Sequence, residues 1–117
     1  MIYTIVDGIK ISYNNQGKIH SFGDMPAVIR ENGYKEWRKN GILHRFEKPA
    51  IVFEDGGKEY WQKGKKHRFN GPAITYANGH QEWWVDGVLH REEGPAVCYK
   101  NGNVEFWEQG KLLLEFK

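Results

Sequence analysis

The chain has 117 residues, of which 39% are hydrophobic and 15% aromatic, and its formal net charge is +2. This length suits one domain, the composition is too apolar for a disordered chain, and the charge is too small to indicate a nucleic-acid partner by itself. The single cysteine, Cys98, excludes an internal disulfide framework and a multi-cysteine zinc site. No apolar run is long enough for a membrane span or a signal peptide, so we expect a cytoplasmic protein.

Most of the chain consists of four copies of one motif, each about 23 residues long. The copies are residues 17–40, 41–63, 64–86 and 87–109, and the first has one extra residue near Gly23 and Asp24. Repeats of this length are units that cannot bury their apolar faces alone and therefore stack on their neighbours. We expect one repeat domain spanning 1–117, with an N-terminal cap hairpin at 1–16 and a C-terminal cap at 110–117.

The N-terminal segment contains two β-branched and aromatic runs, residues 2–6 and 9–13, on either side of Asp7-Gly8. An Asp-Gly pair between such runs predicts a two-residue β-hairpin.

Each later copy contains two turn signals and one Pro-Ala pair, and the segments between them are too short for helices. For the first signal we predict type I′ turns, which need positive φ at both central residues. These signals are Asn32-Gly33, Asp55-Gly56, Asn78-Gly79 and Asn101-Gly102. The second signals are Asn40-Gly41, Lys63-Gly64, Asp86-Gly87 and Gln109-Gly110. Proline cannot donate to a sheet ladder, so each Pro-Ala marks a break, and one copy is predicted to be three short strands.

A two-residue turn at Asp86-Gly87 places Trp83 opposite His90 and Glu82 opposite Arg91. The same register gives the pairs Trp37/His44, Glu36/Arg45, Tyr60/His67 and Glu59/Arg68. Recurring pairs of this kind are typical of cross-strand stabilisation. In the last copy the register would place Glu105 opposite Leu114 and Phe106 opposite Leu113, which marks the C-terminal cap.

Strand alternation separates two sets of aromatic residues. We assign the first set to a continuous core: Trp37, Tyr60, Trp83 and Phe106, with Val28, Ile51, Ile74, Val97, Phe53, Tyr76 and Tyr99. The second set shares its parity with the repeated glutamates Glu36, Glu59, Glu82 and Glu105, which predicts a mixed, solvent-facing surface; it comprises Arg38, Trp61, Trp84 and Trp107.

The run from Gly79 to Arg91, GHQEWWVDGVLHR, resembles the MORN (membrane occupation and recognition nexus) repeat, Y-x-G-E-W-x-x-G-x-x-H-G-x-G. The glutamate, the aromatic residue, the turn glycine and the histidine match. The glycine before the glutamate is absent, arginine follows the histidine, and an added Gly-Pro-Ala strand lengthens the unit. The phrase LHREEGPA is similar to long MORN-like variants of bacteriophages, large DNA viruses and some bacteria. The resemblance implies an all-β, elongated antiparallel β-hairpin repeat sheet that acts as a scaffold for protein association, with phospholipid binding as a further property of the family.

The repeated polar residues are interpreted as structural. His20, His44, His67 and His90 lie beside aromatic residues and before turns, where a ring nitrogen can bind loop backbone, and they would form a row instead of converging on one ion. The four glutamates have equivalent environments, whereas a catalytic carboxylate pair needs two different ones. Cys98 aligns with strand residues of the other copies and is expected to pack. We therefore predict no enzyme activity, no cofactor and no metal.

The candidate partner-binding residues are Arg38, Trp61, Trp84, Trp107, Lys65 and Lys66. Tryptophan and arginine are enriched at interface hot spots, although a second apolar layer under the Pro-Ala segments is the alternative interpretation. Around one turn lie the basic residues Lys63, Lys65, Lys66 and Arg68, which with Trp61 form either a basic aromatic patch for a nucleotide or nucleic acid or a solvated turn.

Three functions remain open from the sequence. The first is a non-enzymatic protein-binding module and, by resemblance, a phage-encoded inhibitor of a host defence factor in the host cytoplasm. The second is a small-ligand or nucleotide-sequestering protein that acts as a homo-oligomer. The third is a module that associates with a membrane surface.

Overall fold

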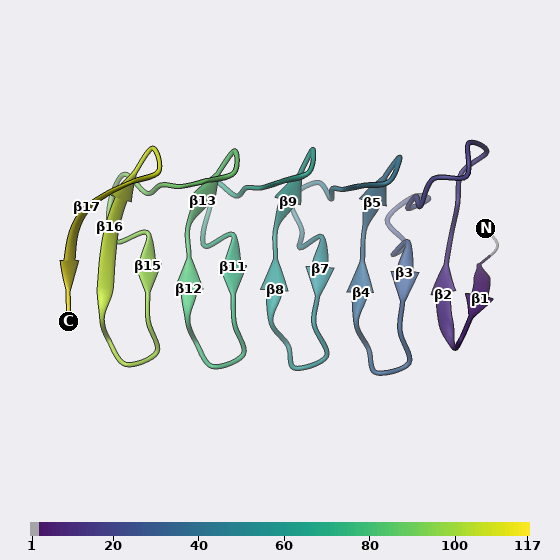
Figure 1. Cartoon of the computed structure of the whole chain (residues 1–117), viewed down its shortest axis with the longest axis horizontal. Coiled ribbons are helices and arrows are strands. Elements are labelled where there is room, and N and C mark those ends of the chain that lie inside the picture. The colour runs from purple at the N-terminus through teal and green to yellow at the C-terminus, as the bar shows by residue number, and fades with distance from the viewer. Residues whose placement is uncertain (1–2) are drawn as a thin grey trace.

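The computed structural model describes residues 3–117, which form an all-β structure without helices in that range. Eleven short strands lie side by side in one antiparallel sheet along the long axis of the molecule (Figure 1). In sheet order they are β1 (Thr4–Val6), β2 (Ile9–Ile11), β3 (Val28–Ile29), β4 (Lys35–Glu36), β7 (Ile51–Val52), β8 (Lys58–Glu59), β11 (Ile74–Thr75), β12 (Gln81–Glu82), β15 (Val97–Cys98), β16 (Val104–Glu108) and β17 (Lys111–Phe116). The predicted elongated antiparallel β-hairpin fold is confirmed. No helix in the described range could span a membrane.

The molecule is long because its strands add in one direction. Its extents are 48 × 25 × 18 Å, and its radius of gyration of 16.0 Å exceeds the ~13 Å expected for a compact domain of this length. Neighbouring strands are about 4.8 Å apart, so ten intervals between eleven strands account for the long dimension.

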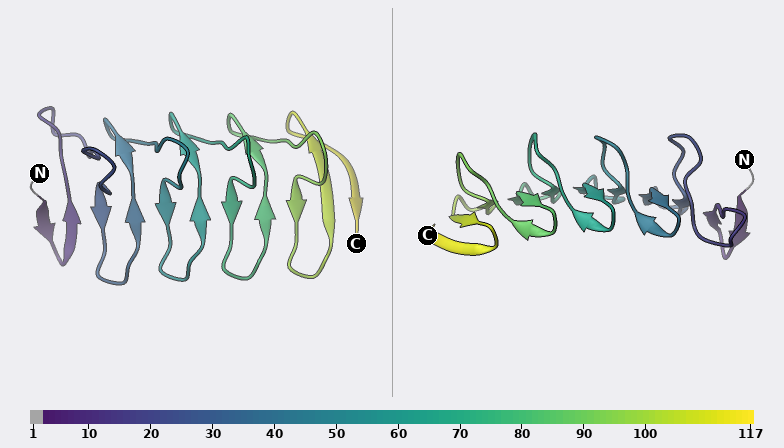
Figure 2. Two further views of the ribbon diagram at one scale, coloured as in Figure 1. Left: turned by 180° about the vertical axis from the view of Figure 1, so that it is seen from behind. Right: turned by 90° about the horizontal axis from the view of Figure 1, so that it is seen from above.

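Three two-stranded ribbons project from the top edge of this sheet, and Figure 2 shows them tilted out of its plane. They are β5 (Arg38–Lys39) with β6 (Ile42–Leu43), β9 (Trp61–Gln62) with β10 (Lys65–Lys66), and β13 (Trp84–Val85) with β14 (Val88–Leu89). The third predicted strand of a copy is thus split at Trp37, Tyr60 or Trp83, where the chain passes from the main sheet into a ribbon.

The second set of turn signals forms two-residue turns, as expected for Asp86-Gly87, and these turns are type I′. Asp86 and Gly87 have φ values of 48° and 83°, and Lys63 and Gly64 have 51° and 78°, so both central residues are left-handed as a type I′ turn requires. The ribbon register Trp84↔Leu89 and Val85↔Val88 is also as expected.

The first set of turn signals adopts a different turn, and the type I′ prediction is wrong there. In the hairpin from Tyr76 to His80, only Gly79 has positive φ. The Tyr76 N–H donates to the His80 carbonyl, the Gly79 N–H donates to the Tyr76 carbonyl, and the His80 N–H donates to Asn78 Oδ1. This is a three-residue loop with a left-handed glycine, in which the asparagine caps the turn with its side chain instead of adopting positive φ.

The hydrophobic core consists mainly of the alanine and the following aliphatic residue of each Pro-Ala segment. Ala27, Ala50, Ala73 and Ala96 are all 0% exposed, and Val28, Ile51, Ile74 and Val97 are buried beside them. Burying an aliphatic side chain of this size contributes about 1.5–3 kcal/mol. The Trp37 N–H donates to the Ala50 carbonyl and the Ala50 N–H donates to the Glu59 carbonyl, so Ala50 is bonded to the chain segments on both sides of it.

The aromatic core assignment is wrong in part. Trp37 is buried, but Tyr60, Trp83 and Phe106 are only half-buried. Tyr76 and Tyr99 are 47% and 40% exposed and lie on the surface. The register pairs Ile74 with Glu59 and Glu82, so the aliphatic row shares its face with the glutamates and not with Trp83. A single sheet has no second layer that could cover a whole aromatic face. Side chains on both faces of the sheet therefore remain partly exposed to solvent.

Both end hairpins form. Val6 pairs with Ile9 across Asp7-Gly8, while Met1 and Ile2 lie outside the described residues. At the other end, Phe106 pairs with Leu114 and Trp107 with Leu112, so Leu113 is an extra residue in a β-bulge. The bulge shifts the register by one, and the expected pairs of Glu105 with Leu114 and Phe106 with Leu113 are replaced.

Candidate interaction surface

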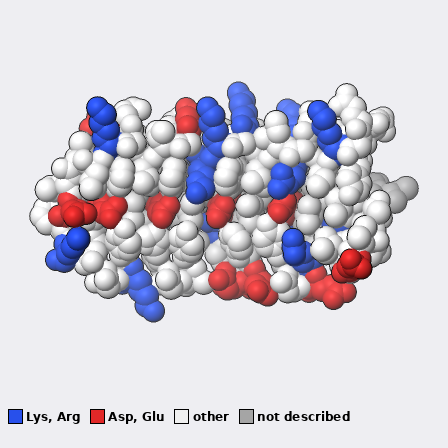
Figure 3. Space-filling view, in the orientation of Figure 1, with Lys and Arg blue, Asp and Glu red and all other residues white. Residues whose placement is uncertain are grey.

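A row of alternating aliphatic and acidic residues crosses one face of the main sheet. The register pairs Glu36 with Val28 and Ile51, and the same alternation continues through Glu59, Ile74, Glu82, Val97 and Glu105. Figure 3 shows the acidic side chains of this face in a line along the long axis. The glutamates occupy alternate strands, and successive carboxylates are therefore about 10 Å apart, too far to share one ion.

Each glutamate accepts a hydrogen bond from the side chain two residues later in the chain. Trp84 Nε1 donates to Glu82 Oε1 at 2.8 Å, and Trp61 and Trp107 make the same bond with Glu59 and Glu105. In the first copy, Arg38 Nε replaces the indole N–H and donates to Glu36 Oε1 at 2.7 Å. Hydrogen bonds therefore connect the tryptophan row to the glutamate row in every copy. In the first copy the guanidinium group of Arg38 makes this bond in place of an indole.

The predicted Glu/Arg cross-strand pairs do not form. The His90 N–H donates to the Trp83 carbonyl, so the neighbouring Trp83/His90 pair is confirmed. One residue later, however, the two strands part. Glu82 enters the main sheet beside Val97, whereas the Arg91 N–H donates to the Trp107 carbonyl of the next hairpin.

On the other side of the glutamate row lie aromatic residues from the hairpin loops. His80 Nε2 lies 2.8 Å from Glu82 Oε2, the Tyr99 hydroxyl donates to Glu105 Oε2 at 2.8 Å, and the Tyr34 hydroxyl donates to Glu36. Burial and the bond to Glu36 raise the pKa of Tyr34, and the bond to Glu105 raises the pKa of Tyr99. Three of the four carboxylates therefore accept bonds on both oxygens, which suits a scaffold more than a proton-transfer group.

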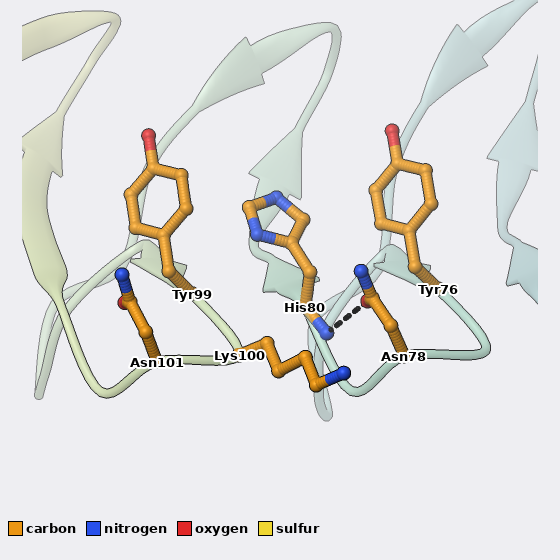
Figure 4. Close-up of a pocket in the computed structure, with 6 residues that line it drawn as sticks. All are labelled: Tyr76, Asn78, His80, Tyr99, Lys100 and Asn101. Carbon is orange, nitrogen blue, oxygen red and sulfur yellow. Dashed lines mark hydrogen bonds between the residues drawn. The ribbon is translucent and has the colours of Figure 1, made fainter.

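Three rings from neighbouring loops form a shallow depression near the lower edge of this face. His80 lies between Tyr76 and Tyr99, with ring centroids 5.0 and 4.9 Å away, and burial raises the pKa of Tyr76. Figure 4 shows the three rings side by side, with Asn78 and Asn101 at corresponding places on the two loops and Lys100 extending between them; these six residues line the depression.

Sequence reasoning missed this cluster as a surface feature. Its signal is that the position two residues before the glutamate varies between copies, being Tyr34, Gly57, His80 and Asn103.

Above the glutamate row, the tryptophans alternate with the hairpin residues opposite them. Arg38 pairs with Leu43, Trp61 with Lys66, Trp84 with Leu89 and Trp107 with Leu112. Lys66 thus stands where the other copies have leucine. Its Nζ lies 4.6 Å from the Trp84 ring centroid and 5.9 Å from that of Trp61. We call these three residues the Trp–Lys cluster.

Among the predicted partner-binding residues, the structure brings the Trp–Lys cluster together and extends it along one row to Arg38 and Trp107. Lys65 does not join it, because it is the adjacent strand residue and its stem lies against Gly87 of the next turn. Within residues 3–117, no carboxylate lies within ion-pair distance of Lys66 Nζ. Trp61, Trp84 and Trp107 are half-buried. Their exposure is therefore intermediate between the two alternatives from the sequence, an exposed binding surface and a covered second apolar layer.

The opposite face carries the first aromatic set, covered by arginine side chains. The guanidinium carbons of Arg45, Arg68 and Arg91 lie 3.7, 4.0 and 3.9 Å from the ring centroids of Trp37, Tyr60 and Trp83, respectively. Each arginine also donates from Nη1 to the carbonyl of its own Pro-Ala proline: Pro49, Pro72 or Pro95. These contacts hold the guanidinium groups over the rings.

The histidine ladder links successive hairpins. Nδ1 of His44 accepts the Lys63 N–H at 3.0 Å, and His20, His67 and His90 accept the corresponding N–H groups of Asn40, Asp86 and Gln109. The expectation that a ring nitrogen binds turn backbone is confirmed. No group of three or more potential metal ligands occurs in the described part of the chain. Cys98 lies in β15 as a half-buried free thiol opposite Gln81 and Val104.

Comparison with protein-family models finds no match, and searches of curated proteins and of solved structures find no significant match either.

Proposed function

We propose that this protein is a non-enzymatic binding module that recognises another protein through the Trp–Lys cluster and the tryptophan row around it. The observation that supports this function most is Lys66. The half-buried Lys66 places its ammonium group 4.6 and 5.9 Å from the centroids of two indole rings, at a position where the three other copies have leucine. No carboxylate of residues 3–117 lies within ion-pair distance of it. Because leucine serves at this position in the three other copies, stacking of the copies does not require a lysine here, and a selective role in binding explains it better.

The chemistry of the cluster favours an acidic segment of the partner with an apolar neighbour. Lys66 supplies one positive charge, and Trp61 and Trp84 supply broad apolar surfaces whose N–H groups are already bound to Glu59 and Glu82. Tryptophan side chains of this kind are the usual anchors of protein interfaces. The resemblance to phage-type MORN-like repeats supports the narrower proposal that the partner is a host factor.

The sharpest test replaces Lys66 with the leucine of the neighbouring copies. Lys66→Leu should keep or increase stability, because it restores the row formed by Leu43 and Leu89, yet it should weaken partner binding at least tenfold. The measurement is affinity capture from lysate of the cognate cell, followed by titration calorimetry with the purified captured protein. Lys65→Leu serves as the matched control and should bind like the wild type. Equal capture by the wild type and Lys66→Leu would contradict the proposal.

A second candidate function, binding of a small ring-bearing ligand such as a nucleotide, is favoured by the depression at Tyr76, His80 and Tyr99. Two exposed phenol rings flank an imidazole there, and Lys100 supplies a charge. Native mass spectrometry after incubation with a nucleotide mixture distinguishes the candidates, since bound small mass that is lost in Tyr99→Ala supports only this one.

A further inference from the structure

Arg45 and Arg91 occupy the same place in two copies but differ in their partners. The guanidinium group of Arg45 forms a bidentate pair with Asp24 of the preceding copy: Nε lies 2.8 Å from Oδ1 and Nη2 lies 2.9 Å from Oδ2. The bond to Arg45 holds the pKa of Asp24 at about 2, with a further contribution from Lys48. Bidentate arginine–carboxylate pairs are among the strongest polar contacts on protein surfaces.

Arg91 has the same pose without the carboxylate. It lies 3.9 Å from the Trp83 ring centroid and donates from Nη1 to the Pro95 carbonyl at 3.0 Å. Gly94 also lies close to the guanidinium group, since a Cβ atom at Gly94 would be only 2.9 Å from the guanidinium carbon. No side-chain acceptor in residues 3–117 bonds its Nε or Nη2.

The position that Asp24 fills is taken by an amide in front of Arg91. Asp24, Glu47, Asn70 and Glu93 are the residues two before the proline of each copy. Asn70 and Arg91 line one hollow with Trp83 and His90, and it corresponds to the hollow that Asp24 and Arg45 line with Trp37 and His44. The copy before Arg68 carries Glu47 at this position, but within residues 3–117 the two side chains form no ion pair, and the guanidinium of Arg68 bonds only the Pro72 carbonyl. Arg91 differs from Arg68 because the preceding copy offers it an amide, Asn70, in place of a carboxylate.

We propose that the Nε and Nη2 edge of Arg91 is a binding site for a carboxylate group of a partner molecule. The guanidinium is already immobilised by Trp83, Gly94 and Pro95, so binding orders little of the protein and a planar acceptor can make two parallel bonds. Glu92 and Glu93 also line this hollow, and their charges reduce the affinity for a lone anion. The site lies on the face opposite the Trp–Lys cluster. Carboxylate binding at Arg91 therefore does not depend on whether that cluster binds a protein.

The test follows the arginine Nε–Hε resonances by NMR while acetate replaces chloride at constant ionic strength. In the wild type, the Arg91 resonance should shift and saturate, whereas the Arg45 resonance should stay in place because Asp24 occupies its edge. Asn70→Asp should supply the carboxylate internally and abolish the acetate shift at Arg91. Asp24→Asn, the reciprocal change, should create a saturable shift at Arg45.

Two capped tripeptides then identify the source of the carboxylate. One carries it only on an aspartate side chain and the other only at a free C-terminus, and the tighter binder identifies the natural source. An Arg91 resonance that does not saturate with acetate, or that responds equally in the Asn70→Asp variant, would overturn the proposal. Both outcomes are independent of Lys66 and are therefore distinguishable from a failure of the proposed protein-binding function.

Discussion

His44 shows how one side chain joins two hairpins through its tautomer. Its Nδ1 accepts a backbone N–H from Lys63, so the neutral ring must carry its proton on Nε2. Burial lowers the pKa of His44, and the positive charges of Lys39 and Lys63 lower it further. Protonation of Nδ1 would place its N–H group against the Lys63 N–H, and the hydrogen bond that links the two hairpins would be lost.

We therefore predict that the protein loses stability as the pH falls below about 6.5, the ordinary histidine value. The folded-state pKa of His44 is depressed, so the unfolded chain binds more protons in this range and folding is favoured above it. Urea unfolding at pH 8 and pH 5.5 should give a smaller free energy of unfolding at the lower pH, and the difference should shrink in His44→Asn. A His44 NMR titration midpoint at or above 6.5 would contradict this prediction.

At the scale of elements, the ribbon turns differ in how well their first residue tolerates positive φ. Asn40 and Lys63 both adopt it, at 49° and 51°. Asparagine visits this region readily, whereas lysine suffers the contact between its Cβ and the following carbonyl.

Lys63→Asn should accordingly stabilise the protein by about 0.5–1 kcal/mol, because it keeps the backbone N–H that binds His44 and relieves the strained conformation. The reciprocal change, Asn40→Lys, should destabilise by a similar amount. Equilibrium denaturation with an unchanged m-value would measure both effects. A destabilised Lys63→Asn variant would show that the lysine makes a contact that outweighs its strain.

The turns also show what the sequence could predict and what it could not. Spacing and Gly-containing dipeptides located the hairpins, and the ribbon register at Asp86-Gly87 followed from them. Yet Asn78-Gly79 and Asn40-Gly41 are identical dipeptides in different turns, because the flanking strands decide which residues pair. The Glu82/Arg91 pair failed for the same reason, since the strands diverge after Trp83.

The candidate site was predictable to a similar degree. Strand parity placed Trp61 and Trp84 in one row, and the departure from the repeat at Lys66 is visible in the sequence. The bond from Trp84 to Glu82 could not be foreseen, because it joins side chains on either side of the point where the chain leaves the main sheet for a ribbon. The surface cluster of Tyr76 and Tyr99 was assigned to the core because parity alone does not show which face is covered.

At the scale of the whole molecule, each copy contacts only its neighbours, and stability should be close to a sum over copies. Deleting residues 64–86 joins Lys63 to Gly87 and regenerates a ribbon turn. The shortened protein should fold cooperatively, with an m-value about one-fifth lower and a long axis about 10 Å shorter. Circular dichroism with urea and small-angle scattering would measure both. An unfolded product would mean that the copies are not interchangeable.

The regular addition of strands also places equivalent side chains at equal intervals along the molecule, and we call each interval a division. Each copy contributes two strands to the main sheet, so equivalent side chains recur about every 9.6 Å along the long axis. A polyproline II chain advances about 9.3 Å in three residues, and over three divisions the mismatch is only about 1 Å. An α-helix rises 5.4 Å per turn and falls out of step within one or two divisions. A ligand that lies along this surface and contacts every copy therefore keeps its register best as an extended chain with a three-residue period.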